Sequence, residues 1–379
     1  MKILMLFVDM LGAEYLHHGN PDCPETDMDK LFTRLGGTFY EKCYTPGPDT
    51  PRSSACMWSG VYPKTNGCNN RLKYPGRYLS ADINLWKMAE NSGYKCNIYV
   101  RPTINRIGLL PYPYEKKVQY ELFEDALANF SITENSITFF YLPDLHYMMD
   151  VNGYGMNTMG KGTAIAVECI NRILSKFQAD TFDYIMIFSD HGFRIKRRKH
   201  LIDNDRVRTM MFIHKKGDTS IRVDSQIRSN LDVFPTVMDM AGLKISKELD
   251  GKSLLGDGHE YVLIEDHDTF SVKLGQTIEH WAVIRDDGKH WLECNGLWEH
   301  ECQNTDFDED EFRKIVTLKM DDYEINSRLW KTLHMYDNNK LENNTYTTGA
   351  PIKATLLNRG IFKFIKRVLA SVRRRMRSK

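Results

Sequence analysis

Ile3-Leu4-Met5-Leu6-Phe7-Val8-Asp9 is an unbroken apolar run that ends in an acid, close to the start of the sequence. Two other runs have the same form: residues 137–142, followed by Pro143-Asp144-Leu145-His146, and residues 184–188, followed by Ser189-Asp190-His191-Gly192. Apolar runs of this length between helix-like segments are typical of strands buried in a parallel sheet. The sequence therefore predicts an α/β fold with a mainly parallel central sheet flanked by helices.

The acids that follow these runs are candidate metal ligands. Asp9, Asp144 and Asp190 each come at or just after the end of a predicted strand. In open α/β sheets, ligands bind beyond the carboxyl ends of the strands. One aspartate at such a place is common in solvated loops, whereas three at the same edge indicate a metal site.

Another candidate is the segment Asp49-Thr50-Pro51-Arg52-Ser53-Ser54. Thr50 suits an N-cap and Pro51 suits the first helical position, so we expect a helix to begin here. The free backbone N–H groups and the dipole of this helix would favour an anion beside the Thr50 hydroxyl. Chemistry on a phosphate or sulfate ester fits this place, and the alternative is a capped surface helix with no chemical role.

The composition limits the class of protein. A chain of 379 residues is long enough for one large α/β domain or two smaller ones. The net charge of +1 hides an asymmetry, because residues 352–379 contain ten Lys and Arg and no acid. No apolar run approaches the length of a membrane span, and Asp9 cuts the first run short of a signal peptide. The eight cysteines form no CxxC pair, which favours free thiols in a reducing cytoplasm.

Changes in the residue pattern divide the chain into three predicted parts: a core over residues 1–256, a smaller α+β subdomain over 257–351, and a basic amphipathic helix over 352–379. The helices expected in the core cover residues 81–91, 162–177 and 231–241. Pro235 fits the last of these only in its first turn. The short antiparallel strands expected in the subdomain cover residues 261–264, 281–284 and 290–292, and an acidic loop is expected at 306–311.

Several motifs, in this order along residues 1–345, resemble the sulfatase-like branch of the alkaline phosphatase superfamily. Asp9-Met10-Leu11-Gly12 is similar to the sulfatase Asp-Asp-x-Gly start, and Ser189-Asp190-His191-Gly192 resembles the second metal-binding motif. Thr50 lies ten residues before Gly60, the spacing at which the family places its nucleophile. The segments that resemble structural signatures of sulfatases are residues 231–242, 249–254 and 335–344. The resemblance implies that residues 1–256 are a sulfatase-like catalytic core.

The nucleophile position departs from the sulfatase pattern. Sulfatases use a Cys or Ser, oxidised to formylglycine, within Cys/Ser-x-Pro-x-Arg. Here the position is Thr50, and Ser54 stands where the family has its arginine. A threonine cannot become that aldehyde, so the resemblance points to the phosphodiesterases and the phosphoethanolamine and phosphoglycerol transferases of the superfamily, which have Thr nucleophiles.

Those transferases hold one divalent metal with an acid, the Thr and an Asp-His pair. Asp9, Thr50, Asp190 and His191 resemble that ligand set. The donor atoms are oxygens and one imidazole, which suit Mn, Zn or Mg, with Ca as a further candidate. The resemblance therefore implies a divalent-metal cofactor.

The function that follows is a metal-dependent phosphotransferase or phosphodiesterase that acts through a phospho-threonine intermediate. Thr50 attacks phosphorus, and a second alcohol or water then releases the product. Arg52 is a candidate to clamp the phosphoryl oxygens through its fork of donors. His146 and His200 are candidates to protonate the leaving oxygen or to activate the acceptor. Lys199 is a candidate to neutralise phosphate charge, although His200 and Lys199 also fit a solvated basic loop.

A two-metal site is the alternative. Phosphodiesterases of the superfamily build a second site from one Asp and two His. Asp144 and His146 are candidates for two of these ligands, with His267 or His200 as the third. The spacing of Asp144 and His146 departs from the phosphodiesterase pattern, which favours one metal.

The C-terminal part of the chain bears on the location of the substrate. A basic amphipathic helix can lie in a membrane interface, attracted by anionic lipids. Residues 352–379 thus favour a cytoplasmic protein, peripheral on the inner membrane face, which acts on phosphoesters of lipid-linked or surface glycans. The alternatives are docking on a partner protein and non-specific contact with nucleic acid. Nothing elsewhere in the chain resembles a nucleic-acid module, so no specific nucleic-acid partner is expected.

Three other functions compete with this one. A sulfatase-like sulfuric ester hydrolase fits the family but not Thr50. A non-catalytic scaffold fits the fold, but the intact metal-ligand set argues against it. A phosphodiesterase or phosphatase for small cytosolic esters differs from a transferase only in the acceptor.

Overall fold

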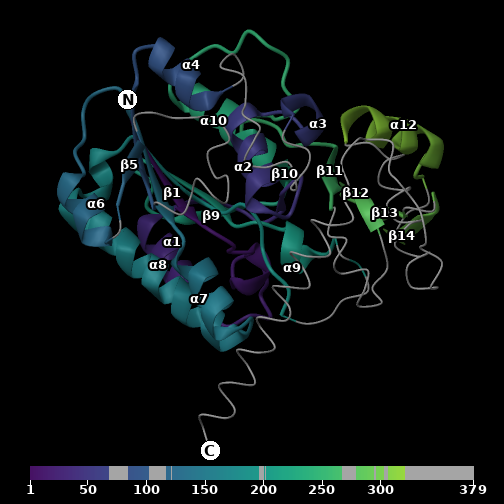
Figure 1. Ribbon diagram of the computed structural model, residues 1–379, viewed down its shortest axis with the longest axis horizontal. Helices are drawn as coiled ribbons and strands as arrows, with labels where there is room; N and C mark the ends of the chain where they lie inside the picture. The colour runs from purple at the N-terminus through teal and green to yellow at the C-terminus, as the bar shows by residue number, and fades with distance from the viewer. Residues whose placement is uncertain are drawn as a thin grey trace, which may run out of the picture. The chain divides into compact units, whose positions relative to one another are not determined.

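The computed structural model describes residues 1–67, 84–101, 117–120, 122–195, 200, 202–266, 279–293, 296–302 and 306–320. Within these residues the chain forms an eight-stranded central sheet with helices on both faces, and a separate four-stranded sheet (Figure 1). The predicted α/β fold, with a mainly parallel central sheet and a smaller antiparallel C-terminal sheet, is confirmed.

The central sheet is built from eight strands, which are β1 (Lys2–Val8), β2 (Gly37–Tyr40), β4 (Lys95–Val100), β5 (Lys117–Gln119), β6 (Ser136–Leu142), β7 (Tyr184–Phe188), β8 (Met211–Lys215) and β9 (Ile221–Asp224). Their order is β5-β4-β6-β1-β7-β8-β2-β9. Strand β8 is antiparallel to both of its neighbours, and the other described pairs are parallel. The three apolar runs of the sequence are thus the adjacent strands β6, β1 and β7. A short parallel pair, β3 (Cys43–Tyr44) and β10 (Arg228–Ser229), lies outside this sheet.

The register of the central strands places their carboxyl ends at one level. Phe7 of β1 pairs with Tyr141 of β6 and with Phe188 of β7, both in parallel. Asp9 therefore follows β1 at the same edge of the sheet at which Asp190 follows β7. This is the edge where ligands bind in open α/β sheets.

The described helices that accompany this sheet along the chain are α1 (Asp27–Leu35), α2 (Thr50–Ser59), α3 (Pro63–Asn66), α4 (Leu85–Asn91), α6 (Phe123–Asn129), α7 (Asp144–Asn152), α8 (Met156–Lys176), α9 (Asn204–Val207) and α10 (Val233–Met240). Alternation along β1 separates two cores, because successive side chains of a strand point to opposite faces. Ile3, Met5 and Phe7 are buried with α2, α4 and α10, and the residues between them are buried with α1, α6, α7 and α8. Figure 1 shows these two groups of helices on opposite sides of the sheet.

The helix bounds differ from the sequence-based expectations in detail. Helix α8 begins at Met156, earlier than the expected residue 162. The described part of the helix expected at 81–91 begins at Leu85, where the side chain of Asn84 accepts the N–H of Lys87. Pro235 is the third residue of α10 and thus lies in the first turn, as predicted.

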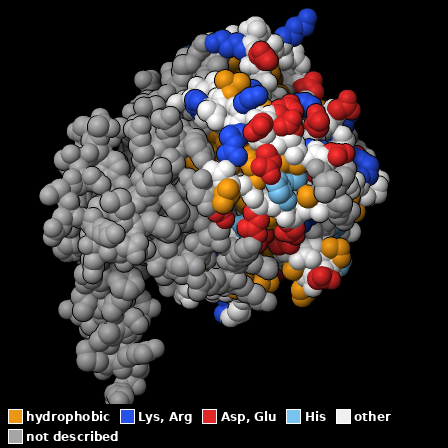
Figure 2. Space-filling model, turned by 90° about the vertical axis from the view of Figure 1, so that its right-hand side faces the viewer, with side chains coloured by type: hydrophobic (Ala, Val, Ile, Leu, Met, Phe, Trp, Pro, Cys, Tyr) orange, Lys and Arg blue, Asp and Glu red, His pale blue; other side chains and the backbone are white. Residues whose placement is uncertain are grey.

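The four-stranded sheet contains β11 (Tyr261–Glu265), β12 (Glu279–Arg285), β13 (Gly288–Glu293) and β14 (Trp298–Cys302) in sequential antiparallel order. The first three strands were predicted, and β14 was not. The predicted acidic loop is wrong in part, because helix α12 (Glu309–Lys319) begins inside it. Its N-cap, Asp308, accepts the N–H groups of Asp310 and Glu311, and acids in a first turn are favoured by the helix dipole. Figure 2 views the molecule from the side of this sheet and α12, and shows acidic side chains gathered there.

Residues Met1–His267 and Thr277–Tyr323 form one compact unit, so β11–β14 pack with the core. The boundaries proposed for the parts 1–256, 257–351 and 352–379 stay a prediction. The motif at 335–344 and the basic helix lie outside the described residues. Among the described helices, none has the length and apolar character that crossing a membrane requires. The described cysteines are free thiols.

The start of α1 is fixed by a buried carboxylate. Asp29 and Thr26 form a capping box, in which each side chain accepts the backbone N–H of the other residue. The carboxylate of Asp29 also accepts the backbone N–H of His18 at 3.0 Å and lies 2.7 Å from His18 Nδ1. Burial alone would raise the pKa of Asp29, but the hydrogen bonds from His18 and Thr26 outweigh burial and hold the pKa well below its usual range.

Replacing Asp29 by asparagine is expected to lower the free energy of unfolding by about 2 kcal/mol at neutral pH, because charge-assisted hydrogen bonds are lost. A pKa that is lowered by folding stabilises the fold fully above the unfolded value, near pH 4, and less as the pH falls further. The difference between wild type and Asp29→Asn should therefore narrow below about pH 4 in urea titrations. Asp27→Asn, at an exposed site of the same helix, is the control. An equal loss in both variants would contradict this account.

Candidate active site

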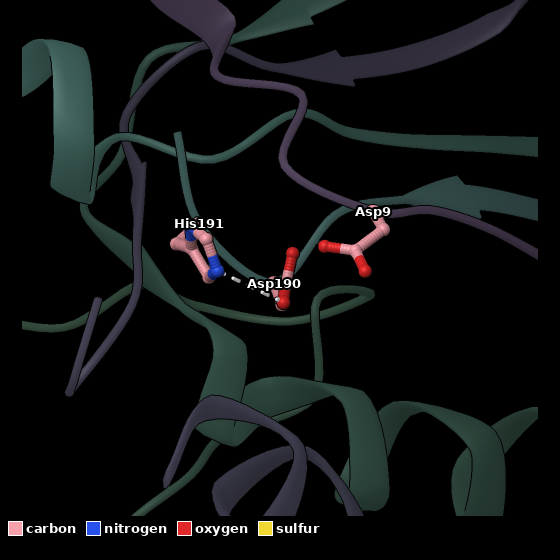
Figure 3. A group of neighbouring side chains, drawn as sticks. All are labelled: Asp9, Asp190 and His191. Atoms are coloured by element: carbon pink, nitrogen blue, oxygen red, sulfur yellow. Dashed lines mark ion pairs between the residues drawn. The ribbon is translucent and has the colours of Figure 1, made fainter. Parts of the chain in front are cut away.

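The ends of β1 and β7 bring Asp9, Asp190 and His191 together (Figure 3). One potential ligand atom of each lies within 4.8 Å of the others, and all three residues are buried. Within the described part of the chain, this is the only group of three such His, Cys or acidic side chains. The structure thus places three of the four predicted metal ligands in one site.

Asp9 is held by groups from β6 and α7. Its Oδ2 accepts the hydroxyl of Tyr141 at 2.5 Å and lies 3.1 Å from Nδ1 of His146. Its Oδ1 is buried and accepts no hydrogen bond from any described residue. A buried carboxylate oxygen normally has a partner, so this oxygen is available to a cation.

The loop after β1 holds the side chain of Asp190 in place. Its Oδ1 accepts the backbone N–H of Met10 at 3.0 Å. Met10 has φ +70°, a left-handed conformation that side chains other than glycine seldom adopt. The Oδ2 of Asp190 is buried, accepts no hydrogen bond from a described residue, and lies 3.3 Å from Nε2 of His191 (Figure 3).

The ring of His191 is oriented by its own neighbour. Its Nδ1 lies 2.8 Å from the carbonyl oxygen of Gly192, which places the ring proton on Nδ1. Nε2 then presents a lone pair to Oδ2 of Asp190. In the neutral ring these two atoms, 3.3 Å apart, are both acceptors, and a proton or a metal ion between them satisfies both. The buried oxygens of Asp9 and Asp190, together with this nitrogen, therefore fit a divalent metal ion.

The two carboxylates influence each other strongly. Burial raises the pKa of Asp190, and the negative charge of Asp9 raises it further. Burial would also raise the pKa of Asp9, but His146, His191 and Tyr141 outweigh burial and lower it. Burial would lower the pKa of His146, yet the adjacent Asp9 carboxylate raises it to about 9. A cation at this place would favour the charged form of both carboxylates.

Thr50 lies at the N-terminus of α2, with its hydroxyl oxygen 3.4 Å from Nε2 of His191. The prediction that Thr50 is the N-cap is wrong. Asp49 is the N-cap, because its carboxylate accepts the N–H of Arg52, and Thr50 is the first helical residue, followed by Pro51. This shift by one residue leaves the Thr50 hydroxyl without a capping role and directs it toward His191.

Two glycines let the segments after β1 and β7 approach each other. A Cβ atom on Gly192 would lie 2.3 Å from the carbonyl oxygen of Asp205 and 3.2 Å from Cα of Gly12. A Cβ atom on Gly12 would meet Cα of Gly192 at the same 3.2 Å. Backbone packs against backbone here, which explains the glycine that follows each metal-ligand motif.

Asn230 is a site residue that the sequence analysis missed. Its amide nitrogen donates to the carbonyl oxygen of Asp190 at 2.8 Å and lies 3.0 Å from the hydroxyl of Ser53 in α2. Its side-chain oxygen accepts the hydroxyl of Thr209 at 3.0 Å. Asn230 therefore joins α2, the helix that carries Thr50, to the segment that carries Asp190 and His191. It lies one residue before the signature predicted at 231–242, and its place there was the only signal in the sequence.

The structure speaks against Arg52 as a phosphate clamp. Its guanidinium is buried and pairs with Asp49 at 2.5 Å, with Asp266 at 3.5 Å and with Glu265 at 3.7 Å. Because these carboxylates occupy its donors, the side chain cannot also enclose a phosphoryl group. Arg52 is a structural neighbour of the site.

The residues predicted as candidate ligands of a second metal contact different partners in the structure. Asp144 begins α7 and lies 3.9 Å from the guanidinium of Arg101, whereas His146 contacts Asp9. His200 is buried, stacks on Trp291 at 3.7 Å between ring centroids, and lies 3.5 Å from Glu299. Lys199 and His267, which were predicted as a phosphate-neutralising residue and a further ligand, lie outside the described residues.

No family model matches this sequence, and neither does any curated protein. Solved structures do match it. A 2-O GAG sulfatase aligns with a TM-score of 0.60 and 16% identity, over 91% of this chain and 95% of that chain. A protein in the alkaline phosphatase superfamily from Vibrio parahaemolyticus aligns with a TM-score of 0.62 and 14% identity, over 90% of this chain and 88% of that one.

A phosphonate monoester hydrolase from Silicibacter pomeroyi also aligns, with a TM-score of 0.59 and 13% identity, over 92% of this chain and 98% of that chain. At these identities the likeness establishes the fold. The chain therefore has the fold of sulfatases and of the alkaline phosphatase superfamily, as the motifs predicted. The chemistry has to be argued from the site.

Proposed function

We propose that this protein is a divalent-metal-dependent phosphotransferase or phosphodiesterase that works through a phospho-threonine intermediate on Thr50. The observation that carries the proposal is the hydroxyl oxygen of Thr50, 3.4 Å from Nε2 of His191, at a site that fits a cation. A nucleophile of this kind needs activation, which an adjacent cation supplies. Thr50 also excludes the formylglycine route, because a secondary alcohol cannot be oxidised to an aldehyde.

The residues divide the work as follows. Asp9, Asp190 and His191 would hold the metal, with Thr50 as the fourth ligand. The bound metal would supply a Lewis acid that favours the alkoxide of Thr50 and offsets charge on the phosphoryl oxygens. Tyr141 and the backbone of Met10 hold the two carboxylates in place.

The proposed reaction consists of two successive displacements at the phosphorus atom of the substrate. Thr50 Oγ1 gives its proton to solvent water and forms a bond to phosphorus, while the bond from phosphorus to the leaving alcohol oxygen breaks. In this proposal His146, which is one-quarter exposed beside Asp9, would donate a proton to that oxygen. An acceptor alcohol or water then gives its proton to the deprotonated His146 and attacks phosphorus. The bond from phosphorus to Thr50 Oγ1 breaks, and Thr50 takes a proton from solvent water to restore its hydroxyl.

The substrate class and location are part of the proposal. The structural neighbours include a protein solved in complex with its substrate, D-glucosamine-2-N,6-O-disulfate, which is an anionic sulfated sugar. For this chain we propose phosphoesters of lipid-linked or surface glycans, met at the cytoplasmic face of a membrane. The support is the basic, amphipathic pattern of residues 352–379, which favours an anionic lipid surface.

The experiment that tests the function compares three esters with purified protein. Bis-aryl phosphate, aryl phosphate and aryl sulfate are each supplied with Mn, Mg, Zn or Ca, with and without a chelator. We expect metal-dependent cleavage of the diester above all, and faster release of the aryl alcohol when an acceptor alcohol such as glycerol is added. Preferred cleavage of aryl sulfate would favour the sulfatase alternative. No turnover with no metal bound would favour the non-catalytic scaffold.

A further inference from the structure

We propose that Arg52 is a positioning residue, the centre of a buried ion cluster that ties the nucleophile helix to the C-terminal sheet and to the metal-ligand segment. The cluster, here named the Arg52 cluster, consists of Arg52, Asp49, Arg206, Glu265 and Asp266. The inference rests on the proposed function in one respect, that Thr50 is the nucleophile.

The first connection fixes the start of α2. Oδ1 of Asp49 accepts the backbone N–H of Arg52 at 3.1 Å, and Oδ2 accepts Nε of the same residue at 2.6 Å. One carboxylate therefore caps the helix and orients the guanidinium. Thr50 lies between these two residues, so a change in this pair changes the position of its hydroxyl.

The second connection runs to the C-terminal sheet. Glu265 is the last residue of β11 and Asp266 follows it. The guanidinium of Arg52 donates to the carbonyl oxygen of Glu265 at 3.3 Å and lies 3.5 Å from the carboxylate of Asp266. The backbone N–H of Glu265 donates to the carbonyl oxygen of Pro46 at 2.8 Å, in the loop before α2. The C-terminal end of β11 is thus held by Pro46, which precedes Thr50 in the sequence, and by Arg52, which follows it.

The third connection reaches the metal ligands. Arg206 of α9 pairs with the same Asp266 carboxylate, and its carbonyl oxygen accepts the N–H of Gly192 at 2.8 Å. Gly192 directly follows His191 and orients its ring. A single buried carboxylate therefore links the helix that carries Thr50 to the segment that carries His191.

The energetics favour a positioning role over a stabilising one. Three carboxylates and the guanidinium of Arg52 are buried together, with the partly buried Arg206 beside them, and desolvation of such groups cancels much of their attraction. Arginine presents a planar fork with donors in fixed directions, whereas lysine is a point charge. The cluster therefore depends on the fixed directions of the N–H donors of Arg52. The substitution Arg52→Lys keeps the positive charge but removes these fixed directions.

The test compares Arg52→Lys with Arg228→Lys. Arg228 is an equally buried arginine that pairs with Asp224 at 2.9 Å and donates to Gly256 O at 2.8 Å, so its partners lie outside α2. For each variant we would measure kcat and KM for a bis-aryl phosphate, the Kd for Mn, the Tm, and amide hydrogen exchange in peptides that cover α2, β11 and residues 190–192. Asp266→Asn is the second variant, because it removes one charge with little change of shape.

In Arg52→Lys we expect kcat to fall by roughly 10- to 100-fold with KM and the metal Kd changed less than about threefold, because misplacement by an ångström costs that much. Exchange should rise together in α2, β11 and residues 190–192. Asp266→Asn should show the same pattern more weakly. Arg228→Lys should lower Tm without lowering kcat.

Two results would overturn the inference. Equal loss of kcat in Arg52→Lys and Arg228→Lys would mean general destabilisation, and exchange that rises only in α2 would mean that no connection reaches the other segments. If the wild-type protein turns over no ester, the proposed function fails. The exchange pattern still decides whether the Arg52 cluster couples the three segments.

Discussion

Replacing Thr50 by alanine is expected to lower the turnover of a bis-aryl phosphate by roughly 10⁴-fold or more, as loss of a nucleophile does in other covalent mechanisms. The change removes the oxygen that forms the bond to phosphorus and leaves Asp9, Asp190 and His191 in place. The fold should survive, because the cap of α2 is Asp49 and not Thr50. Thr50→Ser keeps a hydroxyl and should retain part of the activity.

The control for this change is Ser54→Ala, which removes a buried hydroxyl from the same helix. We expect its turnover to stay within about twofold of wild type, as for a residue outside the reaction. Acid quenching of the wild-type reaction followed by mass spectrometry should show a phosphoryl group on the peptide that contains Thr50. Substantial turnover by Thr50→Ala, or phosphorylation of another residue, would contradict the phospho-threonine mechanism.

Metal is expected to stabilise the protein, and Asp190→Asn is expected to abolish that effect while leaving the metal-free protein at least as stable as wild type. A ligand at 100 times its Kd adds about 2.7 kcal/mol to the stability of the folded state. The metal-free wild type carries two buried carboxylates that face each other, and the pKa of Asp190 is raised by burial and by Asp9. Asparagine removes that repulsion and also removes a ligand.

The measurement is the Tm of both proteins with Mn or Zn and with a chelator, over a range of pH. The shift caused by metal should shrink as the pH falls, because protons compete for a carboxylate whose pKa is raised. Asp144→Asn is the matched control, since Asp144 pairs with Arg101. We expect the increase in Tm caused by metal to persist in this variant. A metal shift that survives in Asp190→Asn would place the cation elsewhere. Loss of half of the bound metal in Asp144→Asn would support the two-metal alternative.

The central part of the fold could be predicted because its signals are local. The apolar runs that became β6, β1 and β7 are buried on both faces, which demands continuous hydrophobic sequence. Asp9 is the first residue after β1 and Asp190 the second after β7, so their meeting at one edge follows from parallel register alone. Strand β14 has no such signal, because a strand with one exposed face carries polar residues.

Residues that act through contacts distant in the sequence could not be predicted. Asn230 contacts Ser53 and Asp190, which lie far away along the chain. Arg52 looked like a phosphate ligand because its position in the motif shows the charge but not the partners. Only the folded chain shows that Glu265 and Asp266 neutralise it.

The sequence by itself determined the order of the elements, the edge of the sheet that carries the site, and the identity of Thr50, Asp9, Asp190 and His191 as candidates. The order of the elements and the acids at the strand ends follow from periodicity, a property of neighbours along the chain, whereas the roles expected of Thr50 and His191 are what the resemblance of their motifs implies. The tertiary structure decided the direction of each side chain: Thr50 toward His191, Arg52 away from substrate, and Asp144 apart from His146. The reason is physical, since a buried charge takes the partner that packing brings to it.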